Sequence, residues 1–144
     1  IYIDDLEAIL SELFSEEMTD IYELEYFHVN TGNNLLPTAT VKLAYQDEIV
    51  EDAACGDGPV AAIFNAIDRV TGTKAKLADY NIRALTRGKD AQGEAYVEII
   101  NNGQSFAGKS ISTDTLEASA KAYLKAVNKM LSKKLKNLKK PNKE

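Results

Sequence analysis

Hydrophobic and polar positions along the chain repeat one order twice: three strands followed by a helix. Segments rich in β-branched and aromatic residues, bounded by turn residues, predict strands over 21–30, 38–45, 48–54, 80–86, 94–100 and 104–111. Apolar residues at helical spacing predict a helix over 59–71 and a second helix whose apolar face runs from Leu116 to Leu131. Ser112-Thr113-Asp114 caps this second helix, and Glu117 is placed to complete a capping box. The sequence therefore predicts an α+β fold of two successive βββα units that form a pseudo-twofold domain.

The two ends of the chain differ from this repeat. Residues 4–14 predict a short amphipathic helix with Leu6, Ile9, Leu10 and Leu13 on one side, and residues 15–20 form an acidic connector. We therefore divide the chain into an N-terminal piece over 1–20, the repeat over 21–132 and a basic tail over 133–144. We expect the basic tail to be disordered, because a lysine-rich terminus is usually solvated.

The most informative stretch is Cys55-Gly56-Asp57-Gly58-Pro59-Val60, where a strand ends in a glycine turn and a helix begins. Pro59 suits the first helical position because its missing N–H would be unpaired there in any case. The free N–H groups of the first turn and the positive end of the helix dipole predict a site for a small anion such as a carboxylate. The alternative is that the stretch is only a tight connection between strand and helix.

Length and composition fit one globular domain with a hydrophobic core, since 44% of the 144 residues are hydrophobic. No apolar run is long enough to span a membrane, and a single cysteine fits a reducing cytoplasm. A chain that begins with Ile rather than Met is expected to be a piece of a longer protein. The net charge of −5 hides an asymmetry, because residues 1–52 hold thirteen Asp and Glu against one Lys, and residues 121–144 hold nine Lys against one Glu. We expect the two ends to attract each other or a partner.

The chain is poor in residues that perform catalysis or bind metals. With only His28 and Cys55 available, a metal site would consist almost entirely of carboxylates, and no third residue at a readable spacing orients a Cys-His pair. We interpret His28 as a strand residue without a ligand role and Cys55 as a small, buried residue at a strand end. A competing hypothesis is a nucleic-acid-binding module that uses the lysines of 133–143, although the overall acidity and the lack of aromatic residues among those lysines count against it.

Four stretches carry a specific resemblance to one protein family. They are Gly56-Asp57-Gly58-Pro59-Val60-Ala61-Ala62, Leu77-Ala78-Asp79-Tyr80-Asn81-Ile82-Arg83-Ala84, Gly88-Lys89-Asp90-Ala91-Gln92-Gly93-Glu94, and Ser112-Thr113-Asp114 with Glu117-Ala118-Ser119 and the run 122–128. In this order they resemble the C-terminal regulatory domain of 2-isopropylmalate synthase, in a family that also includes citramalate synthase. The resemblance covers residues 38–131, and residues 1–20 resemble the end of the linker subdomain that precedes that domain.

This resemblance implies a regulatory domain without catalytic activity of its own. Family members condense acetyl-CoA with a 2-oxo acid, which is 2-oxoisovalerate in leucine biosynthesis, in an N-terminal metal-dependent TIM barrel. Their C-terminal domain binds the end product and inhibits that reaction. The chain contains none of the barrel, so no cofactor is expected in it, and the divalent metal belongs to the barrel. The expected partners are the effector, a second copy in a homodimer and the barrel of the same polypeptide, in the cytoplasm, without nucleic acid or membrane.

In the family the effector lies between the two βββα units, near the starts of both helices. The matching positions form the first helix opening, a pocket wall and the second helix opening: Gly56, Asp57, Gly58, Val60 and Ala61; Leu77, Tyr80, Ala84 and Ala91; and Ile111 and Thr113. The alternative for Leu77, Ala84 and Ile111 is that they are ordinary core residues. Small alanines at 84 and 91 leave room for a side chain branched at Cγ, which favours leucine over the isoleucine of citramalate synthases. Residues 4–15 are expected to carry the signal toward the missing catalytic part.

Overall fold

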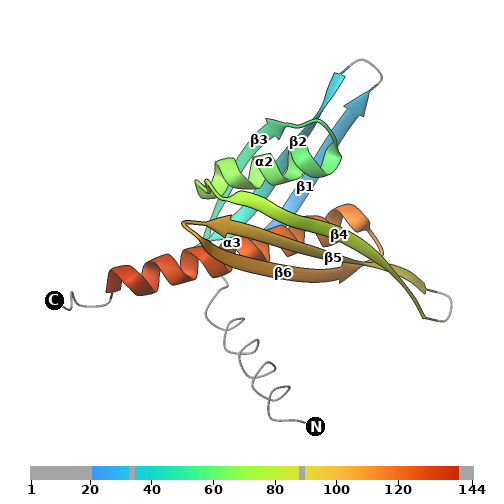
Figure 1. Cartoon of the computed structure of the whole chain (residues 1–144). Helices are drawn as coiled ribbons and strands as arrows, with labels where there is room; N and C mark the ends of the chain where they lie inside the picture. Colours follow the sequence, from blue (N-terminus) through green and yellow to red (C-terminus); the bar gives the residue numbers. More distant parts are fainter. Residues whose placement is uncertain (1–20, 33–34, 88–89, 140–144) are drawn as a thin grey trace, which may run out of the picture.

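The structure contains two sheets, each followed in the chain by a helix. It is a computed structural model that describes residues 21–32, 35–87 and 90–139. The elements are β1 (Glu23–Gly32), β2 (Leu35–Tyr45), β3 (Glu48–Cys55), α2 (Pro59–Thr71), β4 (Lys76–Arg87), β5 (Asp90–Asn101), β6 (Gln104–Ser112) and α3 (Thr115–Lys139). The predicted α+β fold of two βββα units is therefore confirmed (Figure 1). The predicted helix over 4–14 lies outside the described residues.

Each sheet is an antiparallel meander in which neighbouring strands follow one another in sequence, β1-β2-β3 in one and β4-β5-β6 in the other. Two-residue turns join β2 to β3 and β5 to β6, and all four turn residues have positive φ: Gln46 (49°), Asp47 (65°), Asn102 (53°) and Gly103 (79°). Positive φ at both central positions gives the type I′ turn, whose twist matches the twist of the paired strands. The tight connections expected at these two places are confirmed.

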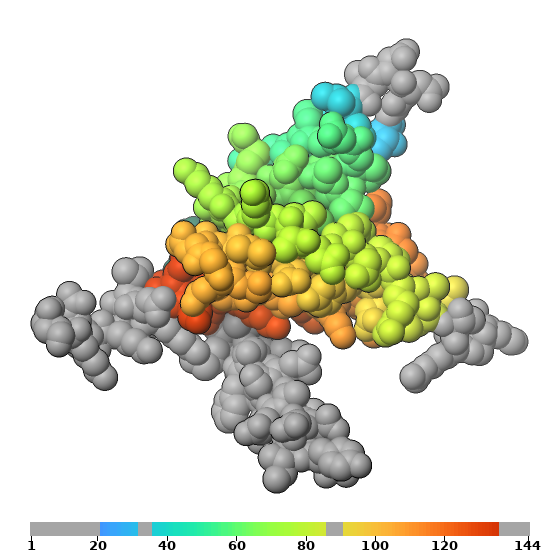
Figure 2. Space-filling model, viewed as in Figure 1, coloured from blue at the N-terminus to red at the C-terminus, as the bar shows by residue number. Residues whose placement is uncertain are grey.

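Each helix packs on the sheet that precedes it. α2 contacts β2 and β3, α3 contacts β5 and β6, and the two helices also contact each other. In Figure 1 α3 lies behind the second sheet, and Figure 2 shows the outer face of that sheet without a helix in front of it. Both units contribute to one core, whose largest fully buried apolar side chains are Val41, Leu43, Ile63, Ile67, Val97, Ile99, Val127 and Met130.

An aromatic cluster joins the two units. The ring of Phe64 in α2 stacks on Tyr123 in α3 with centroids 4.2 Å apart, and it meets the edge of Tyr80 in β4 at 5.5 Å. The hydroxyl group of Tyr123 donates a hydrogen bond of 2.6 Å to Oδ1 of Asp68, and the hydroxyl groups of Tyr80 and Ser119 lie 2.7 Å apart. Buried aromatic rings with satisfied hydroxyl groups fix the relative position of α2, α3 and β4.

The backbone of α3 approaches β6 most closely at Gly108. A Cβ atom added at Gly108 would clash with the carbonyl oxygen of Ala122 and would lie 2.9 Å from the amide nitrogen of Ala126. Only glycine permits this approach, because the obstructing atoms belong to the backbone of a packed helix. Gly108 therefore sets the distance between α3 and the second sheet.

Several expectations from the sequence differ from the structure, and strands β4 and β5 each begin four residues before their expected starts at 80 and 94. Strand β2 begins at Leu35 and not after a loop ending near Pro37, because Gly32 and Leu35 already pair across the β1–β2 hairpin. The expectation that Cys55 is buried is wrong, since its side chain is exposed at the last position of β3. Alternation along β3 places Cys55 on the sheet face that α2 does not cover. Helix α3 continues to Lys139, beyond the boundary expected at residue 132.

Candidate functional site

The start of α2 is open, as the glycine-rich stretch predicted. Gly58 is the N-cap residue, no side chain caps the helix, and Pro59 occupies the first turn. The amide of Ala62 makes the first intrahelical hydrogen bond, 2.9 Å to the carbonyl oxygen of Gly58. The N–H groups of Val60 and Ala61 precede that bond and therefore have no partner within the helix. A Cβ atom on Gly58 would meet no atom within 4 Å, so the space in front of these donors is free.

Gly56 holds this opening in place. Its amide donates a hydrogen bond of 3.1 Å to the carbonyl oxygen of Pro37 in β2. A Cβ atom on Gly56 would clash with the backbone of Ala61 and Ala62 in the first turn of α2. The first turn therefore lies directly against the end of β3, and glycine is required at 56 but not at 58.

The start of α3 differs because the chain caps it with its own carboxylate. Oδ1 of Asp114 accepts a hydrogen bond of 2.9 Å from the amide of Leu116, which confirms the predicted cap. Glu117 does not complete a capping box, since it accepts a hydrogen bond of 2.6 Å from the hydroxyl of Ser112, which in turn accepts one from the amide of Asp114. The bond from Ser112, and then that from Lys121, holds the pKa of the Glu117 carboxyl below its ordinary value. A carboxylate thus already occupies the start of α3, whereas the start of α2 has none.

Strand β4 presents an apolar face beside these helix starts. Tyr80, Ile82 and Ala84 pair with Val97, Ala95 and Gly93 of β5, whose side of the sheet α3 covers. Ile82 is 39% exposed, and a Cβ atom on Gly93 would lie 3.7 Å from its Cγ2 and 3.0 Å from Cγ2 of Thr115, the first residue of α3. The far end of β4 and the start of α3 therefore meet at Ile82 and Ala84.

β4 runs in the opposite direction to α2 and contacts it through Phe64 and Tyr80. α2 ends at Thr71 and β4 begins at Lys76. Tyr80, the fifth residue of β4, contacts Phe64, which lies in the first half of α2. Four residues of helix toward Val60 cover about 6 Å, and two residues of strand toward Ile82 cover about 7 Å. Figure 1 shows α2 and α3 beginning on the same side of the molecule. The start of α2 therefore lies on the side of the molecule on which α3 begins, toward which β4 runs after Tyr80.

Leu77 and Ile111 lie away from this part of the sheet, whereas Ala91 shares the face of Ala84 and Thr113 directly precedes α3. Leu77 shares the face of Tyr80 because a bulge at residue 78 shifts the register, yet seven residues of strand place it about 20 Å from Ala84. Ala91 is exposed at the second position of β5, where it pairs with Thr86, and Thr113 is exposed in the bend before α3. Ile111 pairs with Glu94 on the opposite face of the sheet and is 51% exposed there. Ile82 and Gly93 lie on the face of Tyr80 and Ala84, and the sequence analysis did not select them, although Ile82 alternates with Tyr80 and Ala84.

The structure does not bring His28 and Cys55 together. β1 and β3 flank β2, so their backbones lie about 10 Å apart, and Sγ of Cys55 lies 3.6 Å from Oγ1 of Thr38. Among the residues that the structure describes, no group of three His, Cys, Asp or Glu side chains could hold a metal ion. None of the helices in this part of the chain is long and apolar enough to cross a membrane.

Fold and site together define a duplicated βββα domain with one open and one capped helix start. The chain matches the LeuA allosteric (dimerisation) domain over residues 1–131, and it belongs to that family. It is 47% identical over 128 residues to the 2-isopropylmalate synthase of Ruminiclostridium cellulolyticum, and 49% identical over 128 residues to that of Carboxydothermus hydrogenoformans. These matches cover 89% and 88% of the chain but 25% of each relative, so the chain spans about a quarter of their length.

Proposed function

We propose that the chain is an end-product sensor: it binds leucine at the start of α2 and so inhibits the condensation of acetyl-CoA with 2-oxoisovalerate by a longer enzyme. Two findings support the proposal. The family is that of an allosteric domain, and relatives such as those of Ruminiclostridium cellulolyticum and Heliobacterium modesticaldum are 2-isopropylmalate synthases. The regulatory domain is the part of such enzymes that this chain matches.

The observation that carries the proposal is the contrast between the two helix starts. Asp114 supplies a carboxylate to the N–H groups of α3, whereas Gly58 leaves the N–H groups of Val60 and Ala61 without an anion. A free amino acid brings the missing carboxylate, and the helix dipole favours it at that end of α2. Because the two units share one architecture, the carboxylate of the effector would cap the N-terminus of α2 as the Asp114 carboxylate caps that of α3.

Groups around the opening fit the other parts of an amino acid. The carboxylate of exposed Asp57 can accept a hydrogen bond from the ammonium group. Half-buried Tyr80, exposed Ile82 and small Ala84 form an apolar wall for the side chain. Leucine and isoleucine differ only in branch position, a change that apolar pockets discriminate by about 1–3 kcal/mol. Leucine is our choice because small, exposed Ala84 and Ala91 leave room for a side chain branched at Cγ, and isoleucine is the alternative.

Calorimetric titration tests this site with four ligands: leucine, isoleucine, leucinamide and 4-methylpentanoate. We expect leucine to bind more tightly than isoleucine. Leucinamide lacks the carboxylate and is expected to bind at least about tenfold more weakly, since a hydrogen bond to a charged group contributes about 1.5–3 kcal/mol. If leucinamide binds as tightly as leucine, the start of α2 does not bind the carboxylate. If neither amino acid gives heat at millimolar concentration, the proposal is wrong.

The proposal includes self-association, because the matched family is a dimerisation domain. Large apolar side chains also remain exposed on the outer sheet faces, where Ile49 is 57% and Ile111 is 51% exposed. A second copy would cover such surface, as is usual in symmetric homodimers. Light scattering at tens of micromolar is expected to give twice the mass of one chain, and the mass of a single chain would contradict this part of the proposal.

A further inference from the structure

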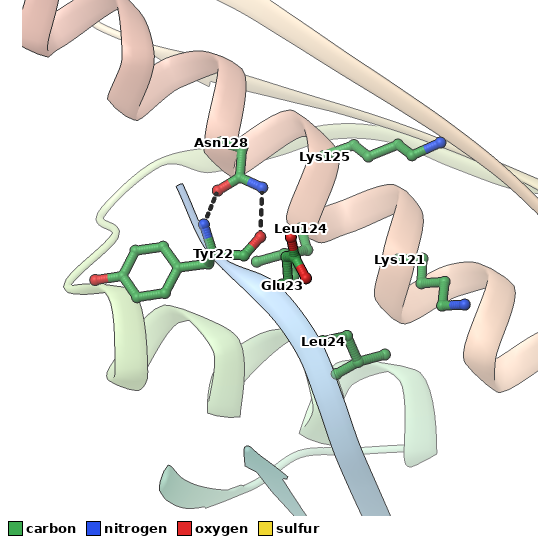
Figure 3. Close-up of a pocket in the computed structure, with 7 residues that line it drawn as sticks. All are labelled: Tyr22, Glu23, Leu24, Lys121, Leu124, Lys125 and Asn128. Carbon is green, nitrogen blue, oxygen red and sulfur yellow. Dashed lines mark hydrogen bonds between the residues drawn. The ribbon is translucent and has the colours of Figure 1, made fainter. Parts of the chain in front are cut away.

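A buried amide on α3 holds the point at which the chain enters the first sheet. The amide nitrogen of Tyr22 donates a hydrogen bond of 3.0 Å to Oδ1 of Asn128, and Nδ2 of Asn128 donates one of 2.9 Å to the carbonyl oxygen of Tyr22 (Figure 3). The two residues are 106 positions apart in the sequence, and Asn128 is only 4% exposed. Tyr22 lies one residue before the first pair of the β1–β2 ladder, that of Glu23 with Ala44. Asn128 therefore bonds both backbone groups of Tyr22, as a neighbouring strand would.

The start of β1 is held by these bonds and by the ring of Tyr22, which stacks on Tyr45 of β2 with centroids 4.9 Å apart. A cavity of about 230 Å³ lies between β1 and α3, lined by Tyr22, Glu23, Leu24, Lys121, Leu124, Lys125 and Asn128 (Figure 3). A second cavity of about 240 Å³ continues beside it and shares Leu24 and Lys121 with it. Because there is open space on this side of β1, the segment at Tyr22 can shift relative to α3 without a clash. Its distance from α3 is then set by the two hydrogen bonds to Asn128, while its ring stacks on Tyr45.

The same helix carries the residues that touch the proposed effector site. Ser119 is fully buried, and its hydroxyl contacts the hydroxyl of Tyr80 and donates to the carbonyl oxygen of Thr115. Nine residues of helix, about 13 Å, separate Ser119 from Asn128. No glycine or proline interrupts α3 between Thr115 and Lys139, so the helix moves as one body. A shift at Tyr80 therefore reaches Tyr22 through α3.

We propose that Asn128 is the positioning residue that couples the effector site to the chain segment preceding β1. The inference rests on the proposed function, because it needs an effector that contacts the wall around Tyr80. Leucine against Tyr80 fixes Ser119 and α3, and α3 then holds Tyr22 through both hydrogen bonds. A ligand shifts an equilibrium only by binding one state better than the other. Here the favoured state is the one in which the bonds between Asn128 and Tyr22 are formed.

Amide hydrogen exchange of Tyr22, followed by NMR with and without leucine, tests the coupling, because this amide donates to Asn128. In the wild-type chain saturating leucine is expected to slow exchange of the Tyr22 amide by about 5-fold or more, the lower end of usual allosteric couplings. The variant Asn128→Ala should lose this response, and because coupling is reciprocal its affinity for leucine should fall by no more than about the factor by which leucine slows exchange in wild type. Lys125→Ala is the matched control, because Lys125 lines the same cavity but makes no bond to Tyr22.

The outcomes separate this inference from the proposed function. If the wild-type chain binds leucine without a change at Tyr22, or if Asn128→Ala keeps the response, the coupling role is wrong and the effector site stands. If the wild-type chain does not bind leucine, the proposed function fails and the inference fails with it. The wild-type comparison needs no substitution, so it decides the matter even if Asn128→Ala does not fold.

Discussion

A carboxylate introduced at Gly58 should block the effector site without harming the fold. Gly58 has a φ angle of −151° and a ψ angle of 173°, an extended conformation that any residue adopts, and a Cβ atom there would meet no atom within 4 Å. Aspartate is also a favoured N-cap residue, so Gly58→Asp is expected to leave stability unchanged or to raise it by a few tenths of a kcal/mol. The new carboxylate would lie where Asp114 lies at the start of α3.

The loss of affinity follows from what the effector can no longer reach. The side chain of Gly58→Asp would occupy the N–H groups of Val60 and Ala61, so leucine would lose two hydrogen bonds to its carboxylate. Each such charge-assisted bond contributes about 1.5–3 kcal/mol, and two like charges about 4 Å apart near a protein surface repel by about 4 kcal/mol. Loss of about 3 kcal/mol corresponds to about a hundredfold weaker binding, and repulsion can only increase this figure.

Titration calorimetry of leucine against four chains checks this reasoning. Gly58→Ala adds bulk without a cap or a charge, so it should weaken binding less than Gly58→Asp, because it leaves the N–H groups of Val60 and Ala61 free. Gly58→Asn caps the helix without charge and should fall between Gly58→Ala and Gly58→Asp. In the longer enzyme, Gly58→Asp is expected to keep its catalytic rate and lose most of its inhibition by leucine. Wild-type affinity in a folded Gly58→Asp chain would show that the glycine turn is only a connection.

Two further predictions concern stability. Gly108→Ala is expected to lower the free energy of unfolding by about 3 kcal/mol or more in urea titrations, because its methyl group would clash with the backbone of α3 at Ala122, and Gly58→Ala is the control that adds the same group in open space. Burial raises the pKa of Asp68 from 3.8 to about 6, against the opposing hydrogen bond from Tyr123. The native state therefore holds this proton more tightly than the unfolded chain, so the contribution of Asp68 to stability is lost as pH rises from about 4 through about 6. Asp68→Asn should accordingly lose less thermal stability than wild type between pH 4.5 and 7, and equal losses would contradict the assignment.

The sequence by itself determined the elements and their order. Type I′ turns at Asn102-Gly103 and the cap at Asp114 depend on residues within a few positions, and so does the start of α2 at Pro59. Their signals therefore survive in a single sequence, since backbone dihedral preferences and short-range hydrogen bonds decide them. The open helix start was predicted for the same reason, because glycine and proline leave its N–H groups without a cap wherever the helix lies in the fold.

Only the tertiary structure decided which side chains share a face and which distant groups meet. The register of β6 and β5 directs Ile111 away from the face of Tyr80, and a bulge returns Leu77 to that face. The bonds of Asn128 with Tyr22 and of Tyr123 with Asp68 join residues 106 and 55 positions apart. A shift of one residue in register turns every side chain of a strand to the other face of the sheet. The hydrogen bonds of Asn128 and Tyr123 depend on how the two units pack against each other. Neither the strand register nor the packing of the two units leaves a local signal in the sequence, because many registers and packings satisfy the same pattern of apolar and polar positions.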